Sequence, residues 1–557
     1  MHLHKHGSGT LHSLTKLFLG MSLSVAASSV LAQVDIKLRF EAGQGLKVEY
    51  HLPPNCPQLK FEKDGPSAAL IRVSWKADNE CFVLDGDYLK ARETPKAGSG
   101  SCRVATFSVP ANINKVSGYP AAFPMGEFLY AHTSNYQVDT RCGDISYEMI
   151  APNIAFEGQQ VSTQARISPA SEISFPVLFS SNPLVVEQGV LSYIDPTLSP
   201  PNVARIKEVS QKTISYLKDA MPKARFMMPI IAAAKLKHPG DIGFDGDAGN
   251  VLRLILFNWP DQVTPDTNTL ITKFVAHEFS HRFQKRDEVD IYPISRVIHE
   301  GGGEYLRWYT SLKMGWMNQE EAANDLDDAL NRCLLGTENK AWQTLSASYV
   351  GARQLEYRCG LAAYAFGLAA RQNPAPAIHN FAEFYAHIQN GERPDFYDAL
   401  ECGKRLDCHP QWLPQLFASR TSMAEVWQEF VTATGLAHLT PPNQSQLDVM
   451  MKKAFGILMR DDCGGSSMFE ASDGLIVDDL KTCKLLRKGM KIIGVEGHKI
   501  FGNANSLTAY LDACRARGKV KLQLAEGADV ELECKTLYVP QKYFYAVDIK
   551  KLLQRLN

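Results

Sequence analysis

The sequence lacks any uninterrupted apolar stretch of about 18 residues, the minimum that a membrane-spanning helix needs. It also lacks a long run of lysine and arginine, and its formal net charge is -1, so nothing in it is typical of nucleic-acid binding. We find no internal repeat and no low-complexity tract. A chain of 557 residues is too long for one hydrophobic core, so we expect about three globular domains and no membrane span.

The N-terminus has the features of an export signal. A mildly basic start precedes a short apolar run at residues 17–27, and Val30-Leu31-Ala32 places small residues where a signal peptidase reads them. The alternative is a membrane anchor, but the run is short for one, and no cysteine follows Ala32 to carry a lipid. We therefore predict a signal peptide at residues 1–32 and an exported protein, periplasmic or secreted.

The cysteines include no CxxC pair, so a zinc site built from cysteines is not expected. An even number of 12 in an exported chain predicts disulfide bonds, with buried free thiols as the alternative. Each of three groups of four allows three pairings, and spacing does not choose among them. The groups are Cys56, Cys81, Cys102 and Cys142; Cys333, Cys359, Cys402 and Cys408; and Cys463, Cys483, Cys514 and Cys534.

The order of patterns along the chain predicts a multidomain α+β protein. Residues 33–192 form a β-rich, β-sandwich-like domain, because β-forming segments alternate with turn residues. Residues 193–202 contain three prolines and are predicted to be a linker. The predicted strands of the first domain are DIKLRFEA, ALIRVSWKA, CRVATFSV and ISFPVLF.

Helical periodicity dominates the middle of the chain. Residues 203–455 start with one helix and two buried strands, and a long, mainly helical region follows. Residues 458–540 return to short strands around one helix, and residues 541–557 close the chain with a short amphipathic helix.

A metal-binding pattern lies in the segment VAHEFSH at residues 275–281. On a helix, His277 and His281 lie on one face, so both can hold one ion, and Glu278 is placed to act on a water. HExxH also occurs by chance, and the alternative is a half-buried helix whose histidines only form hydrogen bonds. A zinc hydrolase needs such ligands, an open coordination position and a base.

A second motif, VIHEGGGEYLRWY at residues 297–309, strengthens the metal hypothesis. Glu300 follows His281 by 19 positions and would be the third ligand, while Glu304 would accept the free N–H of a ligand histidine. Three glycines at 301–303 cost about 1 kcal/mol each within a helix, a conflict that often marks a functional site. We predict that they let this helix approach the HExxH helix; the alternative is a glycine loop with no metal nearby.

These motifs resemble those of a known family. HExxH followed after 18 residues by Glu, in an EGxxEY context, is similar to the gluzincin metallopeptidases of the aminopeptidase N type. The order of domains resembles the glycyl aminopeptidase family, which combines an N-terminal β domain, a thermolysin-like catalytic domain and a C-terminal PDZ domain. The resemblance implies one Zn²⁺ per chain held by His277, His281 and Glu300, with Glu278 as general base.

The resemblance also assigns a tyrosine. YRCG at residues 357–360 is similar to the family's Y-x-x-G motif at the start of a helix, so Tyr357 would donate a hydrogen bond to the oxyanion. The alternative is a core tyrosine, and Tyr349 lies close by in the sequence. The stretch at residues 473–500 resembles a PDZ domain and implies a peptide ligand there; a packing domain without a ligand is the alternative.

The sequence departs from the family at one point. The aminopeptidases hold the free amine of the substrate with a glutamate before the HExxH helix, and residues 243–256 contain none. Asp245 or Asp247 would have to replace it, while the strand at Val251–Leu256 could pair with an extended peptide. We therefore expect a zinc aminopeptidase, with an endopeptidase or a catalytically weak peptide-binding protein as alternatives, and a non-peptide hydrolase as a weaker one.

Overall fold

A computed structural model describes residues 33–557 of the chain apart from short internal gaps. The predicted signal peptide, residues 1–32, lies outside the described residues, as do Cys102, Cys402 and Cys408. The gaps fall at residues 55, 79–80, 93–102, 113–118, 168–173, 188–189, 227, 238–241, 285–288, 372–375, 402–411, 472 and 479–481.

The N-terminal part is built on a nine-stranded sheet with the order β4-β7-β2-β1-β10-β12-β9-β8, and β11 pairs with β10. A smaller sheet, β3-β6-β5, packs on it, because Leu59 and Leu89 share a core with Tyr50 and Phe107. The predicted β-rich N-terminal region is thus confirmed. Its strands are β1 (Gln33–Glu41), β2 (Gly45–His51), β3 (Gln58–Lys60), β4 (Lys76–Ala77), β5 (Phe82–Asp85), β6 (Tyr88–Ala91), β7 (Val104–Pro110), β8 (Phe123–Met125), β9 (Phe128–His132), β10 (Asp144–Phe156), β11 (Gln159–Ile167) and β12 (Pro176–Ser180).

One strand prediction in this region is wrong. The segment ALIRVSWKA, residues 69–77, completes helix α1 (Pro66–Arg72) and contributes only the two residues of β4. Pro66 occupies the first turn of α1, where its missing N–H costs nothing. Arg72 ends the helix buried and donates to Asp87. A short apolar run does not distinguish a strand from a helix by periodicity, and here the proline was the signal.

A five-stranded sheet with the order β13-β14-β15-β17-β16 follows. β14, β15 and β17 are parallel, while β16 pairs antiparallel with β17 at the edge of the sheet. Both faces of β17 are buried: Leu252 packs with α2 and α3, and Val251 packs with the N-terminal sheet. The elements are β13 (Val185–Glu187), β14 (Val190–Ile194), α2 (Pro200–Ala220), β15 (Ile230–Leu236), β16 (Gly243–Ala248), β17 (Val251–Phe257) and α3 (Pro265–Ser280).

The predicted linker at residues 193–202 is not a linker in the structure. β14 ends at Ile194, and α2 begins at Pro200, so half of the segment belongs to two packed elements and five residues connect them. Two of its prolines, Pro200 and Pro201, occupy the first turn of α2, where proline is favoured. A cluster of prolines therefore marked a helix start and not a boundary between domains.

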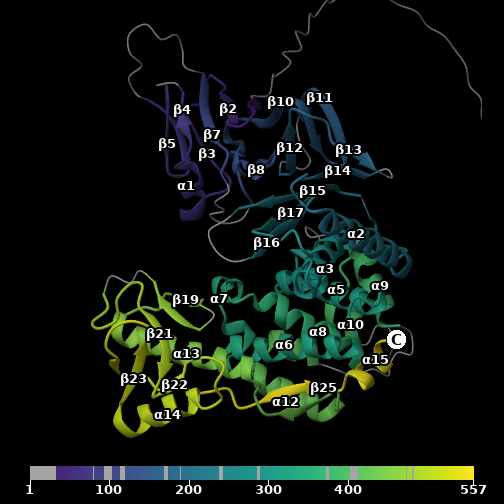
Figure 1. The fold of residues 1–557 in the computed structure, drawn as a ribbon. Helices are drawn as coiled ribbons and strands as arrows, with labels where there is room; N and C mark the ends of the chain where they lie inside the picture. The colour runs from purple at the N-terminus through teal and green to yellow at the C-terminus, as the bar shows by residue number, and fades with distance from the viewer. Residues whose placement is uncertain are drawn as a thin grey trace, which may run out of the picture.

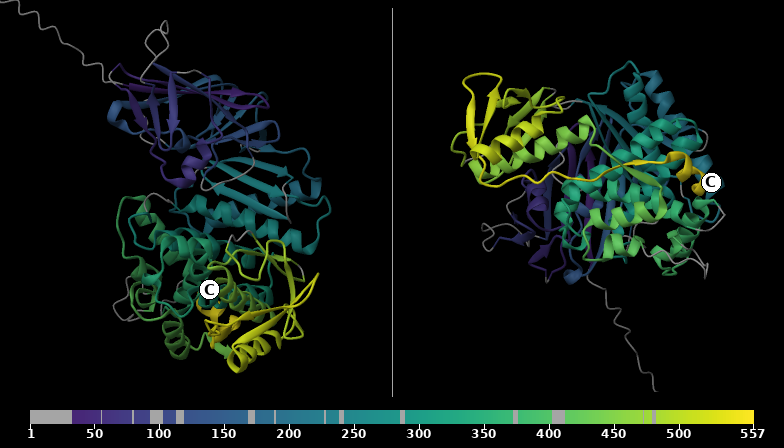
Figure 2. Two further views of the ribbon diagram at one scale, coloured as in Figure 1. Left: turned by 90° about the vertical axis from the view of Figure 1, so that its left-hand side faces the viewer. Right: turned by 90° about the horizontal axis from the view of Figure 1, so that it is seen from below.

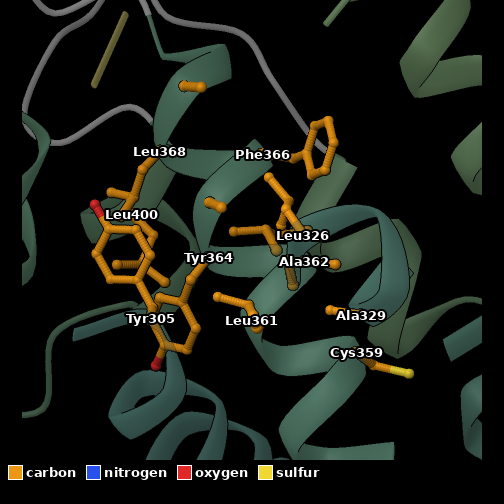
Figure 3. Close-up of a cluster of buried hydrophobic side chains, with 14 of the residues drawn as sticks. Tyr305, Leu326, Ala329, Cys359, Leu361, Ala362, Tyr364, Phe366, Leu368 and Leu400 are labelled. Atoms are coloured by element: carbon orange, nitrogen blue, oxygen red, sulfur yellow. The ribbon is translucent and has the colours of Figure 1, made fainter. Parts of the chain in front are cut away.

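The predicted helical part is confirmed. Helix α8 is apolar on nearly all sides and runs through its centre, where Tyr305, Leu326, Tyr364 and Phe366 belong to one buried cluster (Figure 3). The elements are η3 (His281–Phe283), the π-helix η4 (Val297–Gly301), α5 (Gly302–Lys313), α6 (Gln319–Thr337), η5 (Trp342–Thr344), α7 (Ala347–Ala352), α8 (Leu355–Ala370), α9 (Ala377–Gln389), α10 (Phe396–Glu401), α11 (Trp412–Ala418), α12 (Met423–Thr434) and α13 (Gln444–Cys463).

A six-stranded sheet, β19-β20-β21-β23-β24 with β22 beside β21, forms the C-terminal part together with α13 and α14. The chain then returns to the helical part, where β25 pairs with β18 and α15 buries Leu552 and Leu556 in the helical core (Figure 2). The elements are β18 (Ala437–Thr440), β19 (Met468–Ala471), β20 (Gly474–Val477), β21 (Lys491–Val495), β22 (His498–Lys499), α14 (Ser506–Arg517), β23 (Lys519–Leu524), β24 (Val530–Glu533), β25 (Phe544–Val547) and α15 (Ile549–Leu556).

The parts stack in layers (Figure 1). The N-terminal sheets lie on one face of the five-stranded sheet, α2 and α3 cover its other face, and the remaining helices follow beneath. Among the described helices, none combines the length and the apolar character that crossing a bilayer requires. Four disulfide bonds join described cysteines, each within one of the three groups: Cys56–Cys142, Cys333–Cys359, Cys463–Cys483 and Cys514–Cys534.

Candidate metal centre

Helix α3 positions the HExxH segment. Thr264 caps its N-terminus in a reciprocal capping box with Thr267, and Pro265 occupies the first turn. Phe274 and Phe279 pack into the core beneath the five-stranded sheet and fix the rotation of the helix. This packing leaves the three side chains of the motif nearly buried, with relative exposures of 8% for His277, 9% for Glu278 and 7% for His281.

Three side chains converge at the end of α3. The Nε2 atoms of His277 and His281 are 2.9 Å apart, and the Glu300 Oε2 atom lies 3.7 Å from the first and 3.3 Å from the second. Tetrahedral zinc with bonds of about 2.0–2.1 Å needs ligand atoms roughly 3.3 Å apart. Two imidazoles and a carboxylate with these separations therefore fit a zinc ion.

The outer nitrogen of each histidine lies close to a polar side chain. His277 Nδ1 lies 2.8 Å from Glu304 Oε1, and His281 Nδ1 lies 2.8 Å from Gln284 Oε1. Each ring can therefore keep its Nδ1 proton and turn Nε2 toward Glu300. Glu304 is held in turn by Arg307, a buried residue.

The electrostatics of the cluster favour a cation. Burial lowers the pKa of His277, but Glu300 and Glu304 outweigh that effect and raise it to about 10. Burial opposes ionisation of Glu300, yet hydrogen bonds from the two histidines hold its pKa well below the ordinary value. Two partly buried carboxylates thus stabilise positive charge beside the histidines. By contrast, burial raises the pKa of Glu278 to about 7, a value suited to a base that must take up and release a proton.

The three glycines serve three different contacts. A Cβ on Gly303 would lie 2.7 Å from the His281 ring, so this glycine does let α5 approach the HExxH segment. Gly301, in contrast, faces α8, where its Cβ would meet the Gly360 backbone at 2.5 Å. Gly302 faces the amide of Gln284. The predicted close approach to the HExxH segment is present at Gly303. Gly301 faces α8 instead, because successive residues of a helix are rotated by about 100°.

Tyr357 lies at the cluster, on the first turn of α8. Its ring centroid is 5.7 Å from that of His277. Burial, followed by the charges of Glu300 and Glu278, raises the pKa of the phenol above its ordinary value, so it stays protonated as a donor. Tyr349 points elsewhere, since its hydroxyl donates to the Gly336 carbonyl at 2.9 Å.

Sequence reasoning missed three neighbours of the cluster. Gln284 follows His281 by three positions, a helical spacing that could have identified it. His299 stacks on His281 with centroids 4.1 Å apart, and its place directly before Glu300 was the available signal. Arg307 bridges Glu304 and Asp325. The second contact depends on the packing of α6 against α5, which no local pattern shows.

The two aspartates of β16 are already engaged. Arg253 Nη1 lies 2.8 Å from Asp245 Oδ2, and Arg253 Nε donates to Asp247 Oδ2 at 2.8 Å. Tyr130, from the N-terminal sheet, also donates to Asp247 at 2.9 Å. Arg253 is only 1% exposed, so a buried guanidinium neutralises much of the charge that would attract a substrate amine.

A disulfide fixes the helix that carries Tyr357. Cys333 of α6 is bonded to Cys359, two residues after Tyr357, across a separation of 26 residues. Replacing both cysteines by serine should lower stability by about 3.5 kcal/mol from loop entropy alone, and the thermal midpoint of the helical part by about 10 °C. The measurement is calorimetry together with peptide turnover well below the transition, where we expect reduced kcat from a looser Tyr357.

The control for that variant is the bond Cys514–Cys534, which closes a comparable separation of 20 residues in the C-terminal part. Its double serine variant should lose similar stability and keep full kcat. Full kcat in the Cys333→Ser/Cys359→Ser variant would contradict a role of the bond in holding Tyr357.

Comparison with solved structures supports the fold. An aminopeptidase N family protein from Idiomarina loihiensis superposes with a TM-score of 0.59 at 14% sequence identity, over 94% of this chain and 100% of that chain. An M1 zinc metallopeptidase from Deinococcus radiodurans matches with a TM-score of 0.35 at 14% identity, over 74% of this chain and 94% of that chain. No protein-family model and no curated protein matches the sequence. The chain therefore shares the fold of the Idiomarina loihiensis protein over nearly its whole length.

Proposed function

We propose that the chain is an exported zinc-dependent peptidase whose metal is held by His277, His281 and Glu300. The observation that carries this proposal is the convergence of these three side chains, with Glu304 and Gln284 on the outer nitrogens. The shared fold with an aminopeptidase N family protein supports a peptide substrate. The proposal treats residues 203–455 as a thermolysin-like catalytic domain and 458–540 as a PDZ-like domain.

A zinc ion at this place supplies a Lewis acid for the scissile carbonyl and lowers the pKa of a water. Glu278 takes the proton of the attacking water and delivers it to the leaving amine. Tyr357 donates its phenol proton in a hydrogen bond to the developing oxyanion. Glu304 and Gln284 hold the two imidazoles in the tautomer that presents Nε2.

The engagement of Asp245 and Asp247 by Arg253 bears on the choice between substrate classes. A strict aminopeptidase needs an anion for the free amine, and both candidate carboxylates share the single buried guanidinium of Arg253, which offsets one of their two charges. One negative charge remains for an amine, so an aminopeptidase stays the first proposal and an endopeptidase the alternative. The third candidate, a binding protein without turnover, does not explain why Glu278 is kept buried at the cost of its charge.

The C-terminal part bears on the proposed peptide ligand. Helix α13 packs its apolar face into the core of this sheet, and Tyr510 of α14 donates to the Ala454 carbonyl at 3.3 Å. Asp448 of α13 accepts from the Gly502 N–H at 3.1 Å. α13 thus covers part of the surface beside α14, which favours a packing role over a free peptide groove.

Metal analysis combined with digestion of a mixed peptide library tests the proposed function. We expect about one zinc per chain in residues 33–557 and cleavage products detectable by mass spectrometry. Products one residue from free N-termini would identify an aminopeptidase, and internal cuts an endopeptidase. A full zinc complement with no product from any peptide would contradict the peptidase and favour the binding protein.

A further inference from the structure

A cavity of about 380 Å³ lies between α3, α5 and α6 beside the proposed metal centre. Lys273, Asp325, Asp328 and Arg332 belong to its lining. Lys273 is one helical turn before His277 on α3, so the cavity begins one turn from a proposed ligand. Thr269 and Glu321 are exposed at its rim, and Ser311 is buried at its base.

Arg332 of this lining shares its ion-pair partner with Arg358, a residue of α8 outside the lining. Arg332 Nε lies 2.6 Å from Asp328 Oδ1, and Arg358 Nη1 lies 2.8 Å from Asp328 Oδ2. Two guanidinium groups therefore share one carboxylate. Burial lowers the pKa of Arg358, and the charge of Arg332 lowers it further, as expected for two cations held close together.

The neighbouring carboxylates are committed elsewhere. Asp325 is bonded to Lys273 at 2.7 Å and to Arg307 at 2.5 Å. Glu304 is bonded to Arg307 and lies against His277. Glu321 accepts the Asn318 N–H at 2.8 Å in the cap of α6. None of these three groups forms an ion pair with Arg332 or Arg358 among the described residues.

Both arginines remain accessible to a ligand. Their side chains are 38% and 29% exposed, and Arg358 directly follows Tyr357 on α8. A planar guanidinium matches the geometry of a carboxylate and holds it with charge-assisted hydrogen bonds. A carboxylate placed here would be held by a residue on the same turn of α8 as Tyr357, which we propose to stabilise the oxyanion.

We propose that Arg332 and Arg358 form a subsite for a carboxylate of the peptide substrate. The inference rests on the proposed peptidase function and adds a substrate class: peptides that carry a C-terminal carboxylate or an acidic side chain close to the cleaved bond. It also gives the site a positively charged anchor for the substrate, separate from the carboxylates of Asp245 and Asp247.

Four matched peptides with one cleavable sequence test the subsite. They differ only in a C-terminal carboxylate or amide, and in an aspartate or asparagine next to the cleaved bond. For the wild-type chain, we expect KM to be about tenfold lower for at least one carboxylate form, with kcat unchanged. The pair that shows the difference identifies the source of the carboxylate.

Arg332→Gln and Arg358→Gln should each reduce this preference to about twofold or less, while kcat/KM for the neutral peptides stays unchanged. Arg332→Lys should restore part of it. Arg515→Gln removes a guanidinium from the exposed surface of α14 and serves as the matched control. Equal KM values for charged and neutral peptides, or a preference that survives in both glutamine variants, would overturn the subsite.

Calorimetric binding of the same peptides to Glu278→Gln separates the two proposals. If the carboxylate peptides bind more tightly and Arg332→Gln in that background removes the difference, the subsite stands even where no peptide is cleaved. If the wild-type chain cleaves peptides but neither turnover nor binding distinguishes the charged forms, the subsite fails and the peptidase stands.

Discussion

Glu278→Gln is expected to keep the metal and to lower kcat by about 10³–10⁴-fold. Glutamine has nearly the same shape as glutamate but cannot accept a proton at neutral pH. Glu278 is not one of the three converging side chains, so its replacement leaves the proposed ligand set intact. The measurement is zinc content per chain together with kcat on a peptide identified from the library.

The size of this effect follows from the surroundings of Glu278. The side chain is buried, and burial raises its pKa to about 7, which suits a group that accepts a proton near neutral pH. Glu278→Asp, with a carboxylate drawn back by one methylene, should retain partial turnover. Glu320→Gln, at an exposed position on the first turn of α6, is the matched control and should behave as the wild type. A Glu278→Gln protein with full zinc and normal kcat would refute the assigned base.

The cluster around α3 could be predicted because most of its geometry is local. His277 and His281 are joined by helical spacing, and Gln284 continues the same spacing. Glu300, separated from His281 by 18 residues, and Glu304 were suggested by a second local motif, and the family resemblance supported their roles. Arg307 and Asp325 could not be found in this way, because their contact exists only where α5 and α6 pack together.

The fold shows the same division between local and distant information. Strands β1 and β7 could be predicted because every second residue along most of each strand is apolar, and the structure buries these residues. The prolines at residues 193–202 led to a wrong linker prediction, because proline favours a helix start as well as a loop. The pairing of β18 with β25 joins residues more than a hundred positions apart, and no periodicity within either strand specifies the other.

The close approach of α8 to the glycines at residues 301–303 predicts a large loss of activity when Gly360 is replaced. Gly360 follows Tyr357 by three residues on α8, and Gly301 follows Glu300 directly. A Cβ on Gly360 would meet the Cα atom of Gly301 and would lie 3.3 Å from the Val297 carbonyl oxygen. These neighbours are backbone atoms, so neither can yield by changing a rotamer. Gly360→Ala must therefore push α8 and η4 apart.

Gly360→Ala should lower kcat/KM about 100-fold, because Glu300 and Tyr357 lie on the two segments that separate and an error of about 1 Å at reacting groups has that cost. Overpacking should also reduce the free energy of unfolding by about 1–3 kcal/mol. Gly456→Ala is the control. It lies inside α13, where its nearest neighbour is the flexible Met468 methyl at 3.3 Å, and alanine should stabilise the helix by up to about 1 kcal/mol. Wild-type zinc content and kcat/KM in Gly360→Ala would show that the contact between the two glycines is not what aligns Glu300 with Tyr357.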